Sequence, residues 1–130
     1  MMFRAWGHPN IKATQKNTLE FTKEDYVTPE GDCIVGVNAD FDTAKLREFV
    51  KKHKHVKITI RTGGLQEVIL AKTNPSFNDE KEIVIRLGEY ESERTFAVRA
   101  DKAAKHLSRE LVKALQSGSP IEVNVEEATE

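Results

Sequence analysis

The chain has 130 residues, enough for one compact domain that buries a core without disulfides or a structural metal. Its 20 basic and 21 acidic residues leave a net charge of −1, so no overall field favours nucleic acid or an anionic membrane. One cysteine excludes an internal disulfide, and no apolar leader or membrane-length apolar run is present, so we expect a cytoplasmic protein. The charged fraction of 32% is a composition found more often in thermophiles.

Alternating or short apolar runs predict strands near Phe3–Gly7, Thr18–Thr22, Cys33–Asn38, Val56–Arg61, Leu65–Lys72, Glu82–Leu87, Thr95–Arg99 and Ile121–Val125. Two segments have helical period instead, residues 42–53 and 101–118, and Gly118 with Pro120 ends the second. Gly63-Gly64 predicts a two-residue hairpin, because glycine adopts the positive φ angles of such a turn.

The two halves of the chain repeat the same order of elements. VNAD (37–40) matches VRAD (98–101), and HPN (8–10) resembles TNP (73–75) near the start of each half. We therefore predict an α+β, β-rich single domain built by internal duplication of a βββαβ unit with pseudo-twofold symmetry. The expected architecture is a mixed sheet or barrel with two helices, its halves covering approximately residues 1–62 and 65–127 and joined by the glycine hairpin.

The segment EGDCIVGVNAD (30–40) holds the single cysteine in a predicted strand. Side chains alternate along a strand, so Cys33 shares a face with Val35 and Val37 while Asp32 points the other way. A catalytic thiol needs a polar, electropositive setting with a base in reach. The pattern favours a small buried hydrophobe over a nucleophile.

Asp40 and Asp101 stand at matching positions just before the two predicted helices. Each can cap its helix, although Asp42 competes with Asp40 for the first cap. The alternative places both carboxylates near the pseudo-twofold axis, where they share a metal or a proton.

The motif GHPN (7–10) is the strongest short candidate for chemistry, because it holds an imidazole and a carboxamide on a rigid turn. His8 is a candidate acid, base or ligand near neutral pH, with Asn10 beside it. Histidine and asparagine are also ordinary turn residues that bond their own backbone.

Polar residues also share one face of the predicted strands. Asp32 and Asn38 lie on one strand, and Arg99 is the counterpart of Asn38 in the second half. These side chains either line a polar cleft or form the solvated face of a sheet.

The remaining candidates are weaker. KKHKHVK (51–57) gathers basic groups at the end of the first helix, where lysines suit the helix dipole and a phosphate or RNA contact is the alternative. The sequence has no nucleotide-binding glycine loop, no paired CxxC and no HExxH, so no cofactor and no metal ligands are identified. One cysteine excludes a structural zinc site of the usual kind, and ligation by histidine and aspartate is the alternative left open.

Several segments resemble the archaeal family catalogued as domain of unknown function 371: GHPNI, TLEFTKEDY, TPEGDCIVGVNAD and RTFAVRADKAAKHLSRELVKAL. The resemblance covers essentially the whole chain and implies an archaeal, stand-alone cytosolic protein, but no activity. It implies a histidine where this chain has Gln15, and a second Gly-His-Pro where it reads KTNP (72–75). Those departures leave His8 as the one retained imidazole of that set.

Two hypotheses follow. In the first, the protein binds or hydrolyses a small polar metabolite or nucleotide in a pocket between the halves. His8 and Asp32 are then the catalytic candidates, and the ligand-binding candidates are Asn10, Asn38, Asp40 and Arg99. In the second, it is a non-catalytic module that binds RNA or a protein through residues 51–57 or a sheet edge.

Overall fold

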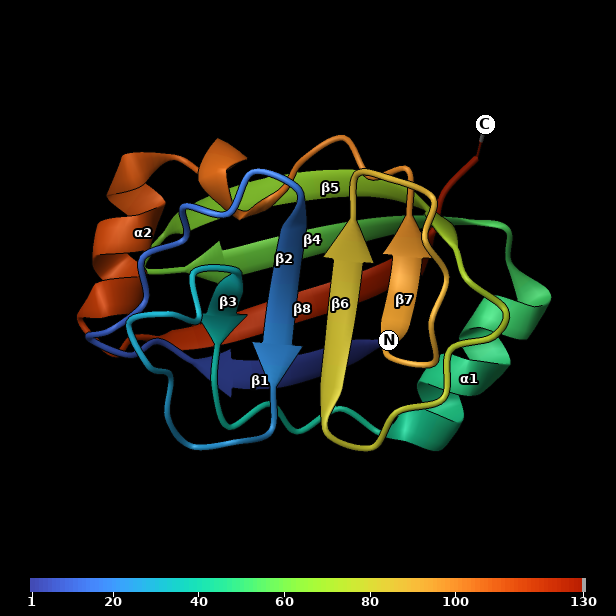
Figure 1. Ribbon diagram of the computed structural model, residues 1–130, viewed down its shortest axis with the longest axis horizontal. Coiled ribbons are helices and arrows are strands. Elements are labelled where there is room, and N and C mark those ends of the chain that lie inside the picture. Colours follow the sequence, from blue (N-terminus) through green and yellow to red (C-terminus); the bar gives the residue numbers. More distant parts are fainter. Residues whose placement is uncertain (130) are drawn as a thin grey trace.

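Two layers of strands cross one another in the structure, a computed structural model that describes residues 1–129 (Figure 1). One layer holds β1 (Met2–Trp6), β8 (Pro120–Glu127), β4 (His55–Thr62) and β5 (Leu65–Thr73). The other holds β3 (Ile34–Gly36), β2 (Thr18–Thr22), β6 (Glu82–Arg86) and β7 (Thr95–Val98). Two helices, α1 (Thr43–Lys52) and α2 (Arg109–Gln116), lie at opposite ends, with a 3-10 turn, η1 (Ala104–His106), before α2.

The strands form one eight-stranded mixed sheet in the order β1-β8-β4-β5-β7-β6-β2-β3. Only the β2–β3 and β6–β7 pairs are parallel among these neighbours. An antiparallel bridge between Trp6 and Val37 joins β1 to the residue that follows β3, so the two ends of the sheet meet. The α+β, β-rich architecture predicted from the sequence is confirmed.

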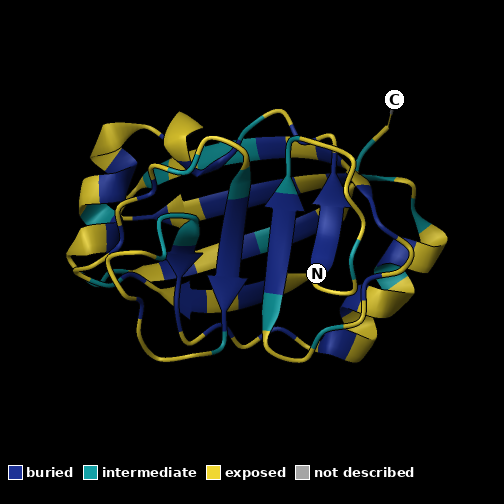
Figure 2. Ribbon diagram, in the orientation of Figure 1, coloured by how far each residue is buried: buried dark blue, intermediate teal, exposed yellow. Residues whose placement is uncertain are grey.

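The core lies between the two layers because apolar residues alternate along the strands. Phe3 from one layer meets Phe21 from the other edge to face, with ring centroids 5.5 Å apart. Burial differs on the two outer faces (Figure 2): β1 and β8 alternate between exposed and buried residues, whereas β2 and β7 are buried almost throughout. The outer face of the β3-β2-β6-β7 layer is therefore shielded from solvent, whereas the outer face of the other layer is open.

The predicted strands and the first helix are present with small shifts at their ends, and the β4–β5 turn has φ 55° at Gly63 and 80° at Gly64. The predicted second helix is not continuous. It divides into η1 and α2, because the side chain of Ser108 accepts the N–H of Leu111 and starts a new helix there. The apolar stripe survives this break, with Leu107 on one side and Leu111 on the other both buried.

The predicted helix caps at Asp40 and Asp101 are wrong. Asp42 caps α1 by accepting from two backbone N–H groups, and Ser108 caps α2. Asp40 instead extends strand pairing: its N–H donates to Arg4 O (3.0 Å), and its carboxylate accepts the Arg4 N–H (2.6 Å). Asp101 does the same with Leu70, at 3.0 Å for both bonds. Each carboxylate thus accepts a backbone N–H group that would otherwise donate to the carbonyl of a neighbouring strand.

Backbone contacts after β3 and β7 also match. Asn38 N–H donates to Glu24 O (2.8 Å), and Arg99 N–H donates to Gly88 O (3.0 Å). Asn38 and Arg99 both have a φ of 52°, in the left-handed region that few non-glycine residues adopt. These recurring contacts support the predicted duplication, which stays a prediction.

The turn after each first strand recurs as well. Asn10 N–H donates to His8 Nδ1, and Ser76 N–H donates to the side-chain oxygen of Asn74, both at 3.0 Å. The contacts pair His8 with Asn74, one position later than the match of HPN with TNP.

No helix within residues 1–129 is long and apolar enough to span a membrane.

Candidate functional site

The GHPN turn is tied to the fold by its own contacts. A side chain at Gly7 would place Cβ 1.9 Å from the carbonyl oxygen of Leu115, so only glycine fits there. The ring nitrogen Nδ1 of His8 accepts the Asn10 N–H, and the Asn10 amide donates to Val27 O at 3.0 Å. These bonds assign His8 and Asn10 a part in building the turn.

The other predicted site residues lie at separate places. Asp32 Oδ1 is 3.5 Å from the amide of Gln15, and the Arg99 guanidinium pairs with Glu89. Asn38 and Asp40 are exposed. Within residues 1–129, no hydrogen bond or ion pair joins His8 to Asp32, Asn38, Asp40 or Arg99. Their joint role in catalysis or binding stays a prediction.

Two hollows contain some of these side chains. Asp40 lines one of about 490 Å³ with Met2 and Lys45. Arg99 lines another of about 410 Å³ with Leu70. Neither hollow holds His8 or Asp32, so the imidazole of the GHPN turn and the predicted carboxylate do not share them.

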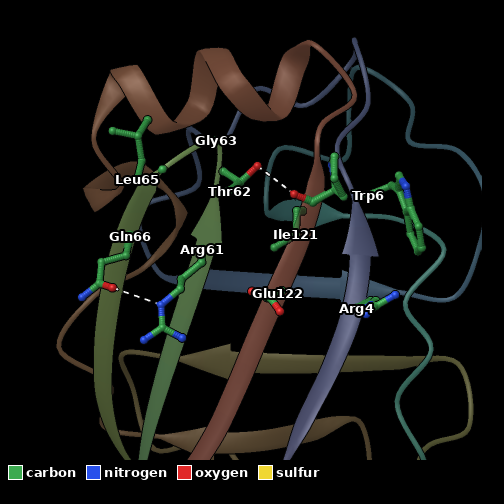
Figure 3. Close-up of a pocket in the computed structure, with 11 residues that line it drawn as sticks. Arg4, Trp6, Arg61, Thr62, Gly63, Leu65, Gln66, Ile121 and Glu122 are labelled. Atoms are coloured by element: carbon green, nitrogen blue, oxygen red, sulfur yellow. Dashed lines mark hydrogen bonds between the residues drawn. The ribbon is translucent and has the colours of Figure 1, made fainter.

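A larger concave surface lies on the open face of the sheet, beside the β4–β5 turn (Figure 3). We call it the hairpin groove. Its volume is about 660 Å³, and its lining residues are Arg4, Trp6, Arg61, Thr62, Gly63, Gly64, Leu65, Gln66, Pro120, Ile121 and Glu122. The groove therefore lies where the two predicted halves of the chain meet.

Strand register places the charged residues of the hairpin groove in one row. Glu122 on β8 is paired with Arg4 on β1 and with Arg61 on β4, and Arg61 is paired with Gln66 on β5. Figure 3 shows Glu122 between the two arginines and Trp6 further along β1. Side chains paired across neighbouring strands lie close together, so two guanidinium groups flank one carboxylate.

Part of this polar surface has no partner among residues 1–129. Arg61 Nε donates to the Gln66 side-chain oxygen at 3.2 Å, and its two terminal nitrogens make no hydrogen bond or ion pair within residues 1–129. The Arg4 guanidinium makes no hydrogen bond or ion pair within residues 1–129. Trp6 is 39% exposed, and the Thr62 hydroxyl donates to Pro120 O at 2.9 Å and fixes the floor of the groove.

A second candidate lies on the opposite, covered face, around Glu20 of β2. Glu20 is 4% exposed, and its Oε1 accepts from Arg94 at 3.1 Å and from the Cys33 thiol at 3.6 Å. Arg94 Nε also bonds Glu82 at 2.8 Å, so one guanidinium bridges two carboxyl groups. A cavity of about 260 Å³ opens beside Glu20, and we call it the Glu20 cavity.

The ionisation of this cluster is displaced from ordinary values. Burial, followed by the hydrogen bond and the charge repulsion of Glu82, raises the pKa of Glu20 to about 8, against the opposing pull of Arg94. Burial and the neighbouring Glu20 raise the pKa of the Cys33 thiol to about 11. Cys33 is half-buried and stays a thiol at neutral pH, so it is not an activated nucleophile.

Sequence reasoning missed both places. Glu20 alternates with buried Leu19 and Phe21, and that pattern indicates a solvated side chain. Arg4 and Arg61 come from predicted strands far apart in the chain, and only the β1-β8-β4 order brings them together. Within residues 1–129, no three ligating side chains converge to hold a metal ion.

Residues 3–128 match the family described as domain of unknown function (DUF371), and the chain belongs to this family. An uncharacterised protein of the archaeon Methanocaldococcus jannaschii is 36% identical over 126 residues, covering 92% of this chain and 93% of that protein. The resemblance identified from the sequence is confirmed. These descriptions carry no activity.

Proposed function

We propose that the protein binds a small anionic metabolite or nucleotide in the hairpin groove. The observation that carries the proposal is the register of β1, β8 and β4, which holds Arg4 and Arg61 on either side of Glu122 with Trp6 beside them. Guanidinium groups recognise phosphate and carboxylate through paired N–H donors, and an exposed indole gives a flat surface for a planar ring.

Binding suits this groove better than hydrolysis. Its lining residues include one carboxylate, Glu122, and neither a histidine nor a cysteine. A phosphate at the guanidinium groups and a ring on Trp6 use the groove without a nucleophile or a general acid.

RNA binding through residues 51–57 has less support. His53 Nδ1 lies 3.2 Å from Glu127, and Lys57 is paired across the strands with Glu126. Lys52 lies 4.0 Å from Glu48. These acidic neighbours offset the basic charge that a phosphate backbone would need.

Trp6 is the single tryptophan of the sequence, so its fluorescence reports directly on the groove. We expect AMP to change this fluorescence saturably and inorganic phosphate to compete with it. Arg61→Ala should weaken AMP binding about tenfold or more, which corresponds to ~1.4 kcal/mol. Lys57→Ala removes a basic residue of the same sheet face outside the groove and should leave binding unchanged.

The proposal fails if AMP, inorganic phosphate and small carboxylates all leave both the Trp6 fluorescence and the melting temperature of the folded protein unchanged. Equal losses in Arg61→Ala and Lys57→Ala would also contradict it, because they would indicate a diffuse charge effect. A loss confined to Arg61→Ala and Arg4→Ala, with native circular dichroism, assigns binding to the groove.

A further inference from the structure

The Glu20 cavity combines acidic groups with an aromatic ring. Glu20, Glu24 and Glu82 contribute carboxyl groups, Tyr26 contributes its ring, and Thr22 a hydroxyl. Val27 and Ile34 supply apolar wall. Arg94, which bonds Glu20 and Glu82, is the positive charge held against them, so the ionised cluster keeps an excess of negative charge.

The corresponding place in the second half already contains a cation. Ala39 N–H donates to Thr22 O (2.9 Å), and Ala100 N–H donates to Arg86 O (3.0 Å), so Thr22 and Arg86 hold matching positions. Asn38 N–H donates to Glu24 O and Arg99 N–H donates to Gly88 O, so Glu24 and Gly88 also match. Two residues further along the chain, Tyr26 therefore corresponds to Tyr90.

The side chain of Arg86 covers the tyrosine of its own half. Its guanidinium carbon lies 5.1 Å from the ring centroid of Tyr90, and its Nε donates to Thr95 Oγ1 at 2.8 Å. This distance is within the range at which a cation is attracted to an aromatic face. The fold therefore places a guanidinium over Tyr90, and nothing in the first half supplies one over Tyr26, because Thr22 is too short.

The first half also has a buried acidic residue where the second half has an apolar one. Glu20 is paired across the sheet with Val84, which is also buried. Valine suits a covered sheet face, whereas a buried glutamate is costly unless a positive partner compensates it. Arg94 is shared between two carboxyl groups, so it compensates Glu20 only in part.

We propose that the Glu20 cavity binds a small organic cation carrying a guanidinium or primary ammonium group, seated over Tyr26 with its N–H groups toward Glu20, Glu24 and Glu82. Within residues 1–129, these carboxyl groups line a cavity but do not converge on one point as metal ligands do. This arrangement suits an organic cation whose N–H donors are separated from one another. The bound cation would take the place that Arg86 occupies in the other half. This site is separate from the hairpin groove and does not depend on it.

The test uses isothermal titration of the whole protein with agmatine, which carries a guanidinium and an ammonium group. Tetramethylammonium serves as the comparison cation, because it has the charge but no N–H donors. We expect saturable binding of agmatine at pH 8 and at least tenfold weaker binding of tetramethylammonium. Arg61→Ala, in the hairpin groove, should bind agmatine as the unaltered protein does.

Thr22→Arg is the decisive variant, because it copies the second half and fills the cavity with a tethered guanidinium. We expect it to abolish agmatine binding while the protein stays folded by circular dichroism. Tyr26→Ala is the second variant. Tyr26 is exposed, so its replacement leaves the packing of the core unchanged, and it should weaken agmatine binding about tenfold. Absence of agmatine binding to the folded protein at millimolar concentration overturns the proposal, as does unchanged binding in Tyr26→Ala.

Discussion

The buried carboxyl of Glu20 makes the stability of the protein depend on pH in an unusual direction. Its pKa is raised from an ordinary value of 4.5 to about 8 in the folded protein. Between these values the folded protein holds a proton that the unfolded chain releases. Stability from this group is fully present below pH 4.5 and is lost as the pH rises through the folded pKa near 8.

The magnitude is limited by linkage. One proton of difference gives a slope of at most ~1.4 kcal/mol per pH unit. Arg94 opposes the upward shift of the Glu20 pKa, so we expect a smaller total, about 1–3 kcal/mol between pH 5 and pH 8. Most surface carboxylates act in the opposite sense, because their folded pKa values are usually lowered by positive partners.

Glu20→Gln isolates this effect, because glutamine has nearly the shape of the protonated acid and does not titrate. We expect the variant to match the unaltered protein near pH 5 and to exceed it in free energy of unfolding at pH 8. The measurement is urea unfolding at a series of pH values, followed by Trp6 fluorescence and circular dichroism. Glu82→Gln should also flatten the profile in part, since burial is the main cause of the raised Glu20 pKa and the charge of Glu82 adds to it.

Parallel pH profiles for Glu20→Gln and the unaltered protein would refute the reasoning. That outcome would mean that Glu20 is ionised across the whole range, with Arg94 compensating it fully. The opposite trend would refute it as well: the stability of Glu20→Gln would then fall relative to the unaltered protein as the pH rises from 5 to 8. Either result would leave the geometry of the cavity intact and remove the protonated acid from it.

Two further predictions concern the backbone. Gly7→Ala should destabilise the protein by about 3 kcal/mol or more, because the new Cβ would lie 1.9 Å from the Leu115 carbonyl oxygen. Gly88→Ala, where the added Cβ meets nothing within 4 Å, should change the free energy of unfolding by about 0.5 kcal/mol or less; equal losses in urea unfolding would contradict the steric argument. Arg99→Asn, which copies Asn38, should stabilise by about 0.5–1 kcal/mol because asparagine tolerates the left-handed φ of 52° better, and a lower melting temperature would oppose this.

Local patterns predicted the elements but not what surrounds them. The alternation of Val56, Ile58 and Ile60 with polar residues is enough to place β4 and its buried face. The glycine pair likewise determined the β4–β5 turn. The break before α2 was not predicted, because Ser108 lies within an apolar stripe whose spacing continues past it.

The candidate sites depended on long-range register, which a single sequence does not contain. Asp40 reads as a helix cap from its neighbours, yet it bonds the backbone of Arg4 because β1 ends beside it. Glu20 reads as solvated, yet Tyr26 and Val27 stand beside it at the cavity on the covered face. Each of these outcomes required knowing which strand lies next to which.

The two sites lie on the outer faces of the two strand layers, on opposite sides of the core, and both use residues that differ between the halves. Arg4 has Leu70 as its counterpart through the matching bonds of Asp40 and Asp101. In the cavity, Thr22 likewise corresponds to Arg86.

Trp6 of the hairpin groove also differs from its counterpart in the second half. Trp6 is bridged to Val37 and Lys72 is paired with Val98, so Lys72 holds the matching position. Residues that match between the halves, such as Asp40 with Asp101, make backbone contacts that hold the strands together. If one unit was duplicated, the matching contacts preserve the fold, and the positions that diverged are the ones free to acquire a ligand. The hairpin groove and the Glu20 cavity are both built from such diverged positions, so substitutions there should alter binding with little effect on the arrangement of the strands.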